Sequence, residues 1–425
     1  MTKDLSIYIH YPFCKSKCPY CDFNSHVREG VDYQRFLSAY EKELEFFAAQ
    51  IGESRKVKTI FFGGGTPSLM PISLVEGILK KIAALWQVDE NCEITLEANP
   101  TSSESAKFKD LRDIGINRLS IGIQALNDAD LKFLGREHSS EEAIKTIETA
   151  AKIFDNFSFD LIYARPQQTL KSWSDELKRA INFGTKHLSL YQLTIEKGTK
   201  FFSQFQKKEF EMPSEELSAQ FYELTDQITA DAGFTAYEIS NYARTTPSPL
   251  VGFEPEDDSL NGYHRRKGWG EGSHNHSERL HDYRSRHNLV YWQGGDYIGI
   301  GAGAHSRIFL NRKKNRSAIM MIHEPLAWLK RVEENGAGIQ NHEKISSGEL
   351  LEELILMGLR LKAGIPNKIF QQFFAKNIEE IFDVKKLQAL ERQGLISLTN
   401  DYIKIIDNVR ILTNAIIIKV VNCLL

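Results

Sequence analysis

The sequence predicts an α/β fold in which a parallel sheet curves into a partial barrel with helices on its outside. Short strand-like runs recur six times in the first half of the chain, and between them lie stretches with apolar residues at three- and four-residue spacing. Six such repeats predict an incomplete (β/α)6 barrel. The predicted strands are Ser6–Phe13, Lys58–Phe62, Glu93–Ala98, Arg118–Gln124, Phe157–Tyr163 and His187–Leu193. The predicted helices are Val31–Ile51, Ser73–Trp86, Ser105–Ile114, Ser140–Phe154 and Leu170–Phe183.

Polar residues inside these strands predict a polar barrel interior. Parallel strands covered on both faces usually consist of unbroken apolar runs, but here polar and apolar side chains alternate. In the run 118–124, Leu119 and Ile121 share one face, while Ser120 and Gln124 share the other. We expect the apolar sets to pack under the helices and the polar sets to line a lumen that holds a polar ligand.

The chain length leaves room for a second, smaller domain at the C-terminus. The 425 residues, 42% of them hydrophobic, are enough for one large domain and a small one. Residues Glu349–Leu361 form an amphipathic helical pattern that Gly364 ends, and Val384–Gln393 with the run 394–398 predicts a helix followed by a strand. We therefore divide the chain into 1–244, 245–284, 285–345 and 346–425.

Three cysteines in one short loop are the strongest functional signal. Cys14, Cys18 and Cys21 have the spacing C-x3-C-x2-C directly after the first predicted strand. Such a loop ligates three irons of a [4Fe–4S] cube and leaves the fourth iron open to a ligand that is not protein. The alternative is a Cys3His zinc site completed by His10 or His26.

Further functional residues follow other strands, at the barrel face where active sites lie. The second strand ends in the turn Gly63–Ser68, whose glycines let backbone groups approach a ligand closely. Glu97 lies near the end of the third strand and Gln124 ends the fourth. These residues and the cysteine loop predict a shared site.

Charge and cysteine usage restrict the partners and the compartment. The 53 Lys and Arg residues against 56 Asp and Glu residues leave a formal charge of −3, which gives no whole-chain electrostatic reason to expect nucleic acid. The cysteines do not suggest a disulfide framework, so a reducing compartment is expected. The first strand begins almost at Met1 and no spanning helix is predicted, so we expect a cytoplasmic protein.

These residues together resemble the radical S-adenosylmethionine (SAM) proteins, in the branch related to oxygen-independent coproporphyrinogen III oxidase. The resemblance covers nearly the whole chain and implies a partial radical-SAM barrel closed by a small, helical, helix-turn-helix-like C-terminal domain. It implies that Cys14, Cys18 and Cys21 bind a [4Fe–4S] cluster whose open iron is chelated by SAM. The SAM contacts that it implies are Tyr8, Gly64, Gly65, Thr66, Glu97, Gln124, Arg136 and Asp160.

Two departures from the oxidase pattern place the chain in the haem-chaperone branch. Phe23 occupies the position where the oxidase has a further cysteine, and only thirteen residues precede Cys14. The motif H-N-x-x-Y-W is also present, which implies that His287, Tyr291 and Trp292 bind haem. The resemblance then implies a chaperone that transfers haem to acceptor proteins, with respiratory proteins as candidates. It leaves open a homodimer and a peripheral contact with the membrane.

Two segments depart from the chaperone pattern as well. The polar stretch 245–284 has the character of an insertion with too few apolar residues for a core, and its four scattered histidines have no regular ligand spacing. Where relatives read Tyr-Gly-x-Pro-Gly-Gln, this chain has Ala164 and Gln167 in place of the glycines. That change constrains the loop after Asp160.

Two rival functions stay open at this stage. The first is a radical SAM decarboxylase that acts on a porphyrinogen propionate, because the implied cofactor residues are all present. The second is a zinc-stabilised or DNA-binding regulator, which the balanced charge disfavours.

Overall fold

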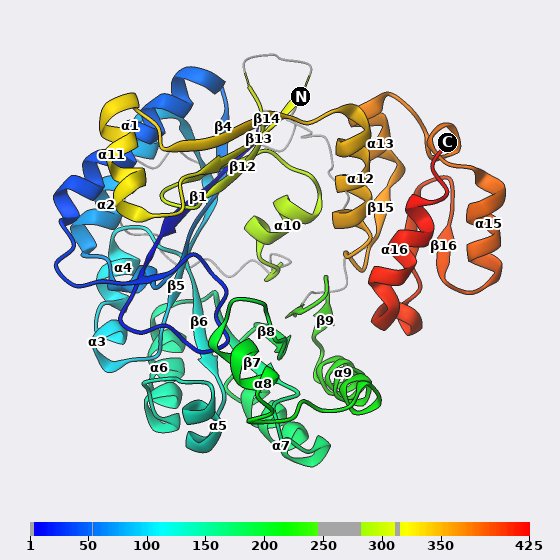
Figure 1. The fold of residues 1–425 in the computed structure, drawn as a ribbon, viewed down its shortest axis with the longest axis horizontal. Helices are drawn as coiled ribbons and strands as arrows, with labels where there is room; N and C mark the ends of the chain where they lie inside the picture. The colour runs from blue at the N-terminus through cyan, green and yellow to red at the C-terminus, as the bar shows by residue number, and fades with distance from the viewer. Residues whose placement is uncertain (1–3, 53, 245–281, 311–314) are drawn as a thin grey trace, which may run out of the picture.

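The computed structural model describes residues 4–52, 54–244, 282–310 and 315–425. Within them, one curved sheet has the strand order β14-β13-β12-β11-β1-β4-β5-β6-β7-β8-β10-β9 (Figure 1). The strands from β11 through β8 run parallel to their neighbours, and antiparallel strands extend both edges. The parallel strands form the partial barrel, and the antiparallel strands at both edges make the sheet wider than the β-α repeats alone would.

The six predicted strands and the alternation with helices are confirmed. The strands are β1 Asp4–Tyr11, β4 Lys56–Gly64, β5 Gln87–Ala98, β6 Arg118–Gln124, β7 Phe157–Tyr163 and β8 His187–Gln192. The helices that follow strands as predicted are α1 Tyr33–Ile51, α2 Ile72–Leu85, α6 Ser140–Ile153 and α7 Leu170–Ile181.

One predicted helix is wrong, because Ser105–Ile114 is not continuous. The structure has α3 at Ser102–Ser105 and α4 at Phe108–Asp113. Between them the N–H of Lys107 bonds to the carbonyl of Glu104, three residues back, which is a tighter turn than an α-helix makes. The Lys107 ammonium donates to the carbonyls of Ser68 and Leu69, so this turn is tied to the end of the second strand unit.

Elements that the sequence did not predict complete the sheet edges and cover them. The added strands are β9 Thr235–Ala236, β10 Asn241–Ala243, β11 Tyr297–Ile300, β12 His305–Phe309, β13 Arg316–Met321 and β14 Ile339–Lys344. The added helices are α5 Asp128–Phe133, α8 Lys200–Gln206, α9 Glu215–Asp231, α10 Arg286–Trp292 and α11 Pro325–Asn335. Figure 1 shows α10 on the concave side of the sheet, between the barrel strands and the C-terminal elements.

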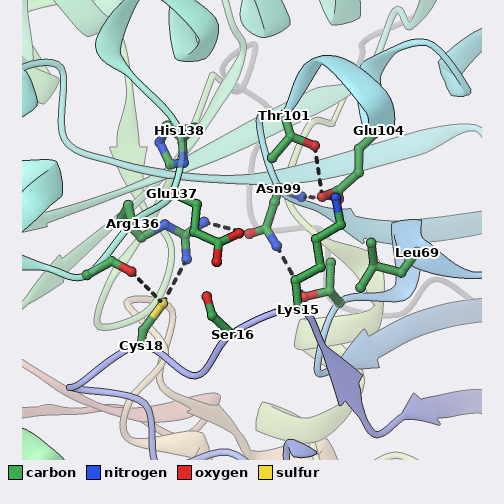
Figure 2. Close-up of a pocket in the computed structure, with 12 residues that line it drawn as sticks. Lys15, Ser16, Cys18, Leu69, Asn99, Thr101, Glu104, Arg136, Glu137 and His138 are labelled. Atoms are coloured by element: carbon green, nitrogen blue, oxygen red, sulfur yellow. Dashed lines mark hydrogen bonds between the residues drawn. The ribbon is translucent and has the colours of Figure 1, made fainter. Parts of the chain in front are cut away.

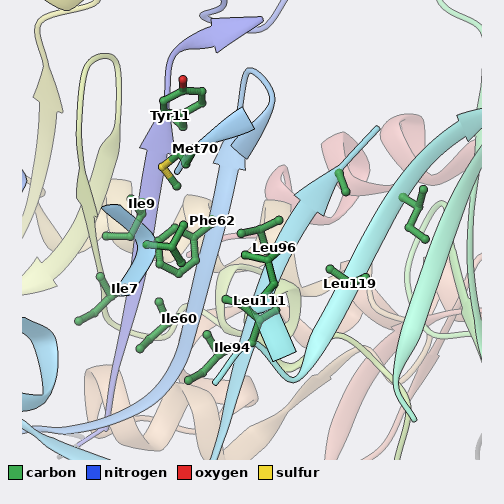
Figure 3. Packing of buried hydrophobic residues seen from close by; sticks show 14 of the residues in the cluster. Ile7, Ile9, Tyr11, Ile60, Phe62, Met70, Ile94, Leu96, Leu111 and Leu119 are labelled. Carbon is green, nitrogen blue, oxygen red and sulfur yellow. The ribbon is translucent and has the colours of Figure 1, made fainter. Parts of the chain in front are cut away.

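The apolar faces of the strands form the core under the outer helices. Ile7 pairs with Ile60 and Ile60 with Ile94, so the same parity carries apolar side chains across neighbouring strands. Leu96 pairs with Leu119 in the same way. Figure 3 shows these side chains on one side of the strands, and all of them are buried. Because adjacent side chains point to opposite faces, the polar set is left to line the lumen.

The C-terminal module has its own core, made from short helices and a small antiparallel sheet. Its helices are α12 Ser347–Gly358, α13 Asn367–Phe374, α14 Ile378–Ile381, α15 Val384–Arg392 and α16 Thr413–Val421. Its strands are β15 Ile365–Pro366, β16 Ile396–Leu398 and β17 Tyr402–Ile405. The helix and strand predicted from 384 to 398 are confirmed. Among the described helices, none is both long and apolar enough to cross a membrane.

The predicted insertion 245–284 lies outside the described residues from 245 to 281. Its last residues, 282–284, are described, and the Arg284 guanidinium forms an ion pair with Asp282 there. The mobility expected of the insertion stays a prediction, as do the four domain boundaries.

Candidate functional site: a cysteine loop at the mouth of a polar barrel

The cysteine loop lies directly beyond the C-terminal end of β1. A short parallel pair of strands, β2 Phe13–Cys14 and β3 His26–Val27, closes its base. Within the loop the N–H of Cys21 bonds to the carbonyl of Cys18, with a distance of 3.1 Å between nitrogen and oxygen. All three cysteines are free and partly exposed. The loop therefore presents its three thiols at the open end of the barrel.

The glycine turn after β4 packs against this loop, which explains its lack of side chains. A Cβ atom on Gly65 would lie 2.6 Å from the carbonyl oxygen of Phe13, and Gly64 has a φ of +109°. The next residue, Thr66, donates from its hydroxyl to the Cys14 sulfur at 3.3 Å. Gly65 is thus required for contact with the base of the cysteine loop, and Gly64 leaves room for the His10 ring.

Arg136 connects the cysteine loop to the ends of β5 and β6. Its guanidinium donates to the Cys18 sulfur at 3.3 Å, to the Asn99 side-chain oxygen at 2.5 Å and to the carbonyl of Gly122 at 2.9 Å. Figure 2 shows Arg136 between Cys18 and Asn99. The guanidinium thus places a positive charge and a hydrogen-bond donor beside one of the three sulfurs.

Two carboxylic acids lie deep in the cleft behind the cysteines. Burial and the nearby Asp160 raise the pKa of Glu97 to about 8, against the opposing effect of a hydrogen bond from the Gly64 N–H. Burial likewise raises the pKa of Asp160 to about 6. Two acids that ionise reluctantly are stabilised as carboxylates by a cationic ligand. The cleft therefore suits a molecule that carries positive charge, such as a sulfonium or an ammonium.

The residues predicted to bind the cluster and SAM, with one exception, line one cleft of about 740 Å³. The three cysteines and Gly64, Gly65, Thr66, Glu97, Gln124, Arg136 and Asp160 all border it. The exception is Tyr8, which borders the lumen behind the cleft and whose hydroxyl lies 3.0 Å from His10 Nδ1. Phe23 also borders the cleft and is 61% exposed, so its ring is available at the position where the oxidase has a further cysteine.

The backbone is strained at Gln124, where β6 ends in the cleft. Its φ is +71°, a left-handed conformation that costs a residue with a side chain about 1–2 kcal/mol. A Cβ atom on the neighbouring Gly122 would lie 2.8 Å from Gln124 Nε2, so that glycine makes room for the amide. Strain of this kind is concentrated at functional sites.

A second cavity of about 790 Å³ continues from the cleft into the barrel lumen. Glu97, Ser120 and Asp160 border both spaces, and Arg118 and His187 border the lumen alone. Arg118 Nε and His187 Nδ1 are buried and have no hydrogen-bond partner within the described part of the chain. The polar lumen predicted from strand parity is confirmed by this lining.

The helix α10 places His287 and Tyr291 inside this lumen. The His287 ring is fully buried, with Nδ1 2.7 Å from the Thr59 hydroxyl and Nε2 2.7 Å from the Tyr291 hydroxyl. The Glu93 carboxylate accepts from the N–H groups of Arg286 and His287 at the start of the helix. Burial, with Arg118 nearby, lowers the pKa of His287 to about 3 and keeps the ring neutral.

Trp292 is separated from the other two residues of its motif. It borders a third cavity, of about 1070 Å³, which lies between the end of α10 and the C-terminal module. The structure therefore brings His287 and Tyr291 together but places Trp292 at a different surface. The spacing in sequence did not show this, because residues four apart share a helix face whereas residues five apart diverge.

The histidines considered for a zinc site are engaged elsewhere. His10 Nδ1 lies 3.0 Å from the Tyr8 hydroxyl and Nε2 lies 2.9 Å from the carbonyl of Asn24, so both ring nitrogens are in use. His26 Nε2 is 3.0 Å from the Asn24 side-chain oxygen. Across the described residues, no group of three or more histidine, cysteine or acidic side chains has the geometry to hold a single metal ion.

Sequence reasoning missed Asn99. Its amide donates to the Thr66 hydroxyl at 3.1 Å and its oxygen accepts from Arg136, so it connects two residues that contact the cysteines. It lies two positions after Glu97 and thus has the same parity. That parity was the available signal, but Asn99 lies just beyond the apparent end of the strand pattern.

Comparison with family sequence models places the fold and the cysteine loop in one class. The Radical SAM superfamily matches residues 8–180, and the HemN C-terminal domain matches residues 345–407. The chain is a radical SAM protein, and membership of that superfamily implies a [4Fe–4S] cluster and SAM.

The particular family follows from similarity along almost the whole chain. The mitochondrial radical S-adenosyl methionine domain-containing protein 1 of Bos taurus is 34% identical over 398 residues, which are 92% of this chain and 82% of the relative. The heme chaperone HemW of Bacillus subtilis is 32% identical over 397 residues, or 92% of each chain. The chain belongs to the family that contains these proteins.

A solved structure shows the same fold. Coproporphyrinogen III oxidase (HemN) of Escherichia coli aligns over 98% of this chain and 89% of its own length, with a TM-score of 0.72 and 21% identity. At that identity the likeness concerns the fold alone.

Proposed function

We propose that this protein binds haem and passes it to acceptor proteins. The observation that carries the proposal is the match to HemW over 92% of both chains. The segment from His287 to Trp292 supports it, because a neutral imidazole can ligate iron and aromatic rings can stack on a porphyrin. We include these three residues in the proposed haem-binding region.

We further propose that Cys14, Cys18 and Cys21 hold the cluster and that SAM occupies the cleft behind them. Support comes from the hydrogen bonds that Thr66 and Arg136 donate to the sulfurs of Cys14 and Cys18. It also comes from Glu97 and Asp160, whose raised pKa values mean that a cationic ligand would stabilise their carboxylates. A cluster held by these three cysteines, once reduced by an external reductant, would supply the electron for cleavage of SAM into methionine and a 5′-deoxyadenosyl radical. The side chains of this chain orient the cofactors and exclude water from the barrel mouth.

The partners in this proposal are haem and haem-acceptor proteins. Respiratory proteins at the membrane are the acceptors that we favour, which would require a peripheral contact of this protein with the membrane. We place the protein in the cytoplasm, because five free cysteines and an iron–sulfur loop suit a reducing compartment.

A second candidate function is decarboxylation of a coproporphyrinogen. The lumen favours it, because a polar cavity of about 790 Å³ adjoins the proposed SAM cleft and shares Glu97, Ser120 and Asp160 with it. Against it stand Phe23 in place of a cysteine and the similarity to HemW.

One experiment separates the two candidates. The cluster is reconstituted anaerobically, the protein is titrated with haemin, and the same preparation is assayed for coproporphyrinogen decarboxylation with SAM and a reductant. Stoichiometric haemin binding without product supports the chaperone. Turnover without a tight haemin site would overturn it in favour of the decarboxylase.

A further inference from the structure

The cavity that Trp292 borders has the features of a ligand site in its own right. Its volume of about 1070 Å³ is slightly above the roughly 300–1,000 Å³ that is typical of small-molecule and cofactor sites. We call it the α10 groove and define it by Trp292 on α10, Leu354 on α12, Ile365 on β15, Ile369 on α13 and Tyr402 on β17. Helices and strands from two parts of the chain thus form one apolar surface.

A close approach between α10 and α12 holds the two walls of the groove together. Gly294, just after α10, has a φ of +69°, and a Cβ atom there would lie 2.2 Å from Leu354. No side chain fits at that point. Trp292 is consequently fixed beside the C-terminal module, although its ring keeps partial exposure to the groove.

The lining of the α10 groove combines aromatic rings with positive charge. Trp292 and Tyr402 provide the rings, while Leu354, Ile365 and Ile369 are buried and apolar. The charged side chains on the lining are Arg284, Lys368 and Asp401, so cations outnumber anions, although Arg284 is also paired with Asp282. Partial burial lowers the pKa of Lys368, which means that an anion nearby would stabilise its ammonium.

We propose that the α10 groove, rather than the lumen, receives the porphyrin ring of haem, with Trp292 and Tyr402 against the ring and the cations near its propionates. This inference rests on the proposed function and deepens it. Haem is a flat, largely apolar molecule with two carboxylates on one edge, and the groove offers apolar and aromatic walls with basic groups among them. His287 then acts as a positioning residue, because its hydrogen bonds to Thr59 and Tyr291 anchor α10.

The lumen is a poorer match for the same ring. It is lined by Glu97, Asp160, Arg118 and several hydroxyls, and both nitrogens of His287 are hydrogen-bonded there. An apolar macrocycle placed in it would leave these buried polar groups without partners, which is costly. The α10 groove imposes no such loss.

The test is an anaerobic haemin titration of the full-length protein, followed by the Soret absorbance, with four variants. Ala363 is exposed and borders the groove, so Ala363→Trp should fill the groove without disturbing the core. Ala363→Trp and Trp292→Ala, made as separate single variants, should each raise the Kd for haemin at least tenfold. Lys385→Glu reverses a charge on an exposed residue of the same module outside the groove, and it should leave the Kd unchanged. His287→Gln keeps side-chain hydrogen bonding, and its effect on the Kd should be smaller than that of either groove variant.

The outcomes distinguish this inference from the function on which it rests. If the wild-type protein binds no haemin, the proposed function itself fails. If it binds haemin but Ala363→Trp and Trp292→Ala bind equally well, the groove assignment is wrong and the function stands. A lost or shifted Soret band in His287→Gln, with groove variants unaffected, would place the iron at His287. Groove variants that bind haemin normally but fail to transfer it would show that the groove receives a polypeptide instead.

Discussion

At the residue scale, the three thiols of the cysteine loop do not share one environment. Cys14 receives a hydrogen bond from Thr66 and Cys18 one from Arg136, while burial raises the pKa of Cys14 and of Cys21. Cluster assembly must overcome this burial, since only the thiolate ligates iron. The hydrogen bond from Thr66 to Cys14 lowers that cost.

Replacing Cys18 with Ala should abolish the cluster and leave the barrel folded. The cysteine is partly exposed in a loop and contributes little to the core, whereas a cube held by two protein thiols loses a third of its anchors. Iron and sulfide content after anaerobic reconstitution measures the loss, and far-ultraviolet circular dichroism measures the fold. Cys423→Ala, in the C-terminal module, is the control that should retain the cluster. A cluster retained in Cys18→Ala would refute the ligand assignment.

SAM affinity should rise with pH through the pKa of Glu97. Below about pH 8 this acid is mostly protonated in the free protein, and it must ionise to pair with a cationic ligand. Affinity should therefore increase, by about tenfold between pH 6.5 and 8.5. Equilibrium dialysis of the reconstituted protein measures this dependence. In Glu97→Gln the binding should be weaker and its pH dependence much flatter, and an unaltered profile in that variant would contradict the assignment.

At the element scale, the loop after β7 contains backbone strain, because two residues with side chains adopt left-handed conformations there. Ala164 and Gln167 both adopt left-handed backbone, with φ of +56° and +62°, a conformation that favours glycine. The fold retains this turn although neither residue is glycine. The Arg165 side chain between them is buried and forms ion pairs with Glu176 and Asp130. These ion pairs hold the loop in its strained conformation.

Gln167→Gly should therefore stabilise the protein. The exposed Gln167 loses no buried contact, and relief of the left-handed strain outweighs the added freedom of the unfolded chain, for a net gain of roughly 0.5–1 kcal/mol. Urea unfolding measures the change. The matched control is Ala151→Gly on the exposed face of α6, where the backbone is right-handed and stability should fall by about 1 kcal/mol. A loss of stability in both variants would show that the loop is not strained.

The element α10 shows how one motif serves two surfaces. Its buried side carries His287 and Tyr291 into the lumen, and its C-terminal end carries Trp292 to the α10 groove. A motif read as one ligand set in the sequence is divided by the geometry of a short helix.

At the scale of the whole molecule, one buried carboxylate joins segments that are far apart in the chain. Glu43 on α1 accepts from the N–H groups of Gly301 and Gly338, both at 2.8 Å, and from the Trp328 indole at 3.1 Å. Burial raises its pKa to about 7, and these donors oppose the shift. Glu43 thus links the first barrel helix to the antiparallel edge of the sheet.

Glu43→Ala should lower the free energy of unfolding by at least about 3 kcal/mol, because it leaves three buried donors without an acceptor. Glu45→Ala provides the control on the same helix. Glu45 is exposed and pairs with Lys81, so its loss should cost under about 1 kcal/mol. Chemical denaturation of both variants gives the comparison. Equal losses would mean that the Glu43 bonds do not stabilise the fold.

The sequence by itself determined the repeating architecture and the contents of the cofactor cleft. Strand parity, helical spacing and the C-x3-C-x2-C loop are local signals, and residues at the ends of parallel strands must meet at one edge of the sheet. Glu97 and Gln124 were predicted for that reason and Asp160 from the family resemblance, and all three line the cleft.

Only the tertiary structure decided the remaining features. The strand β11 pairs with β1 and β10 pairs with β8, each across a long stretch of chain, so no local pattern reveals where the added strands join the sheet. The separation of Trp292 from His287, the three hydrogen bonds of Arg136 and the α10 groove likewise depend on where elements pack against one another. The periodicity of a local sequence predicts which face of an element is apolar. Only tertiary packing determines which other element covers that face.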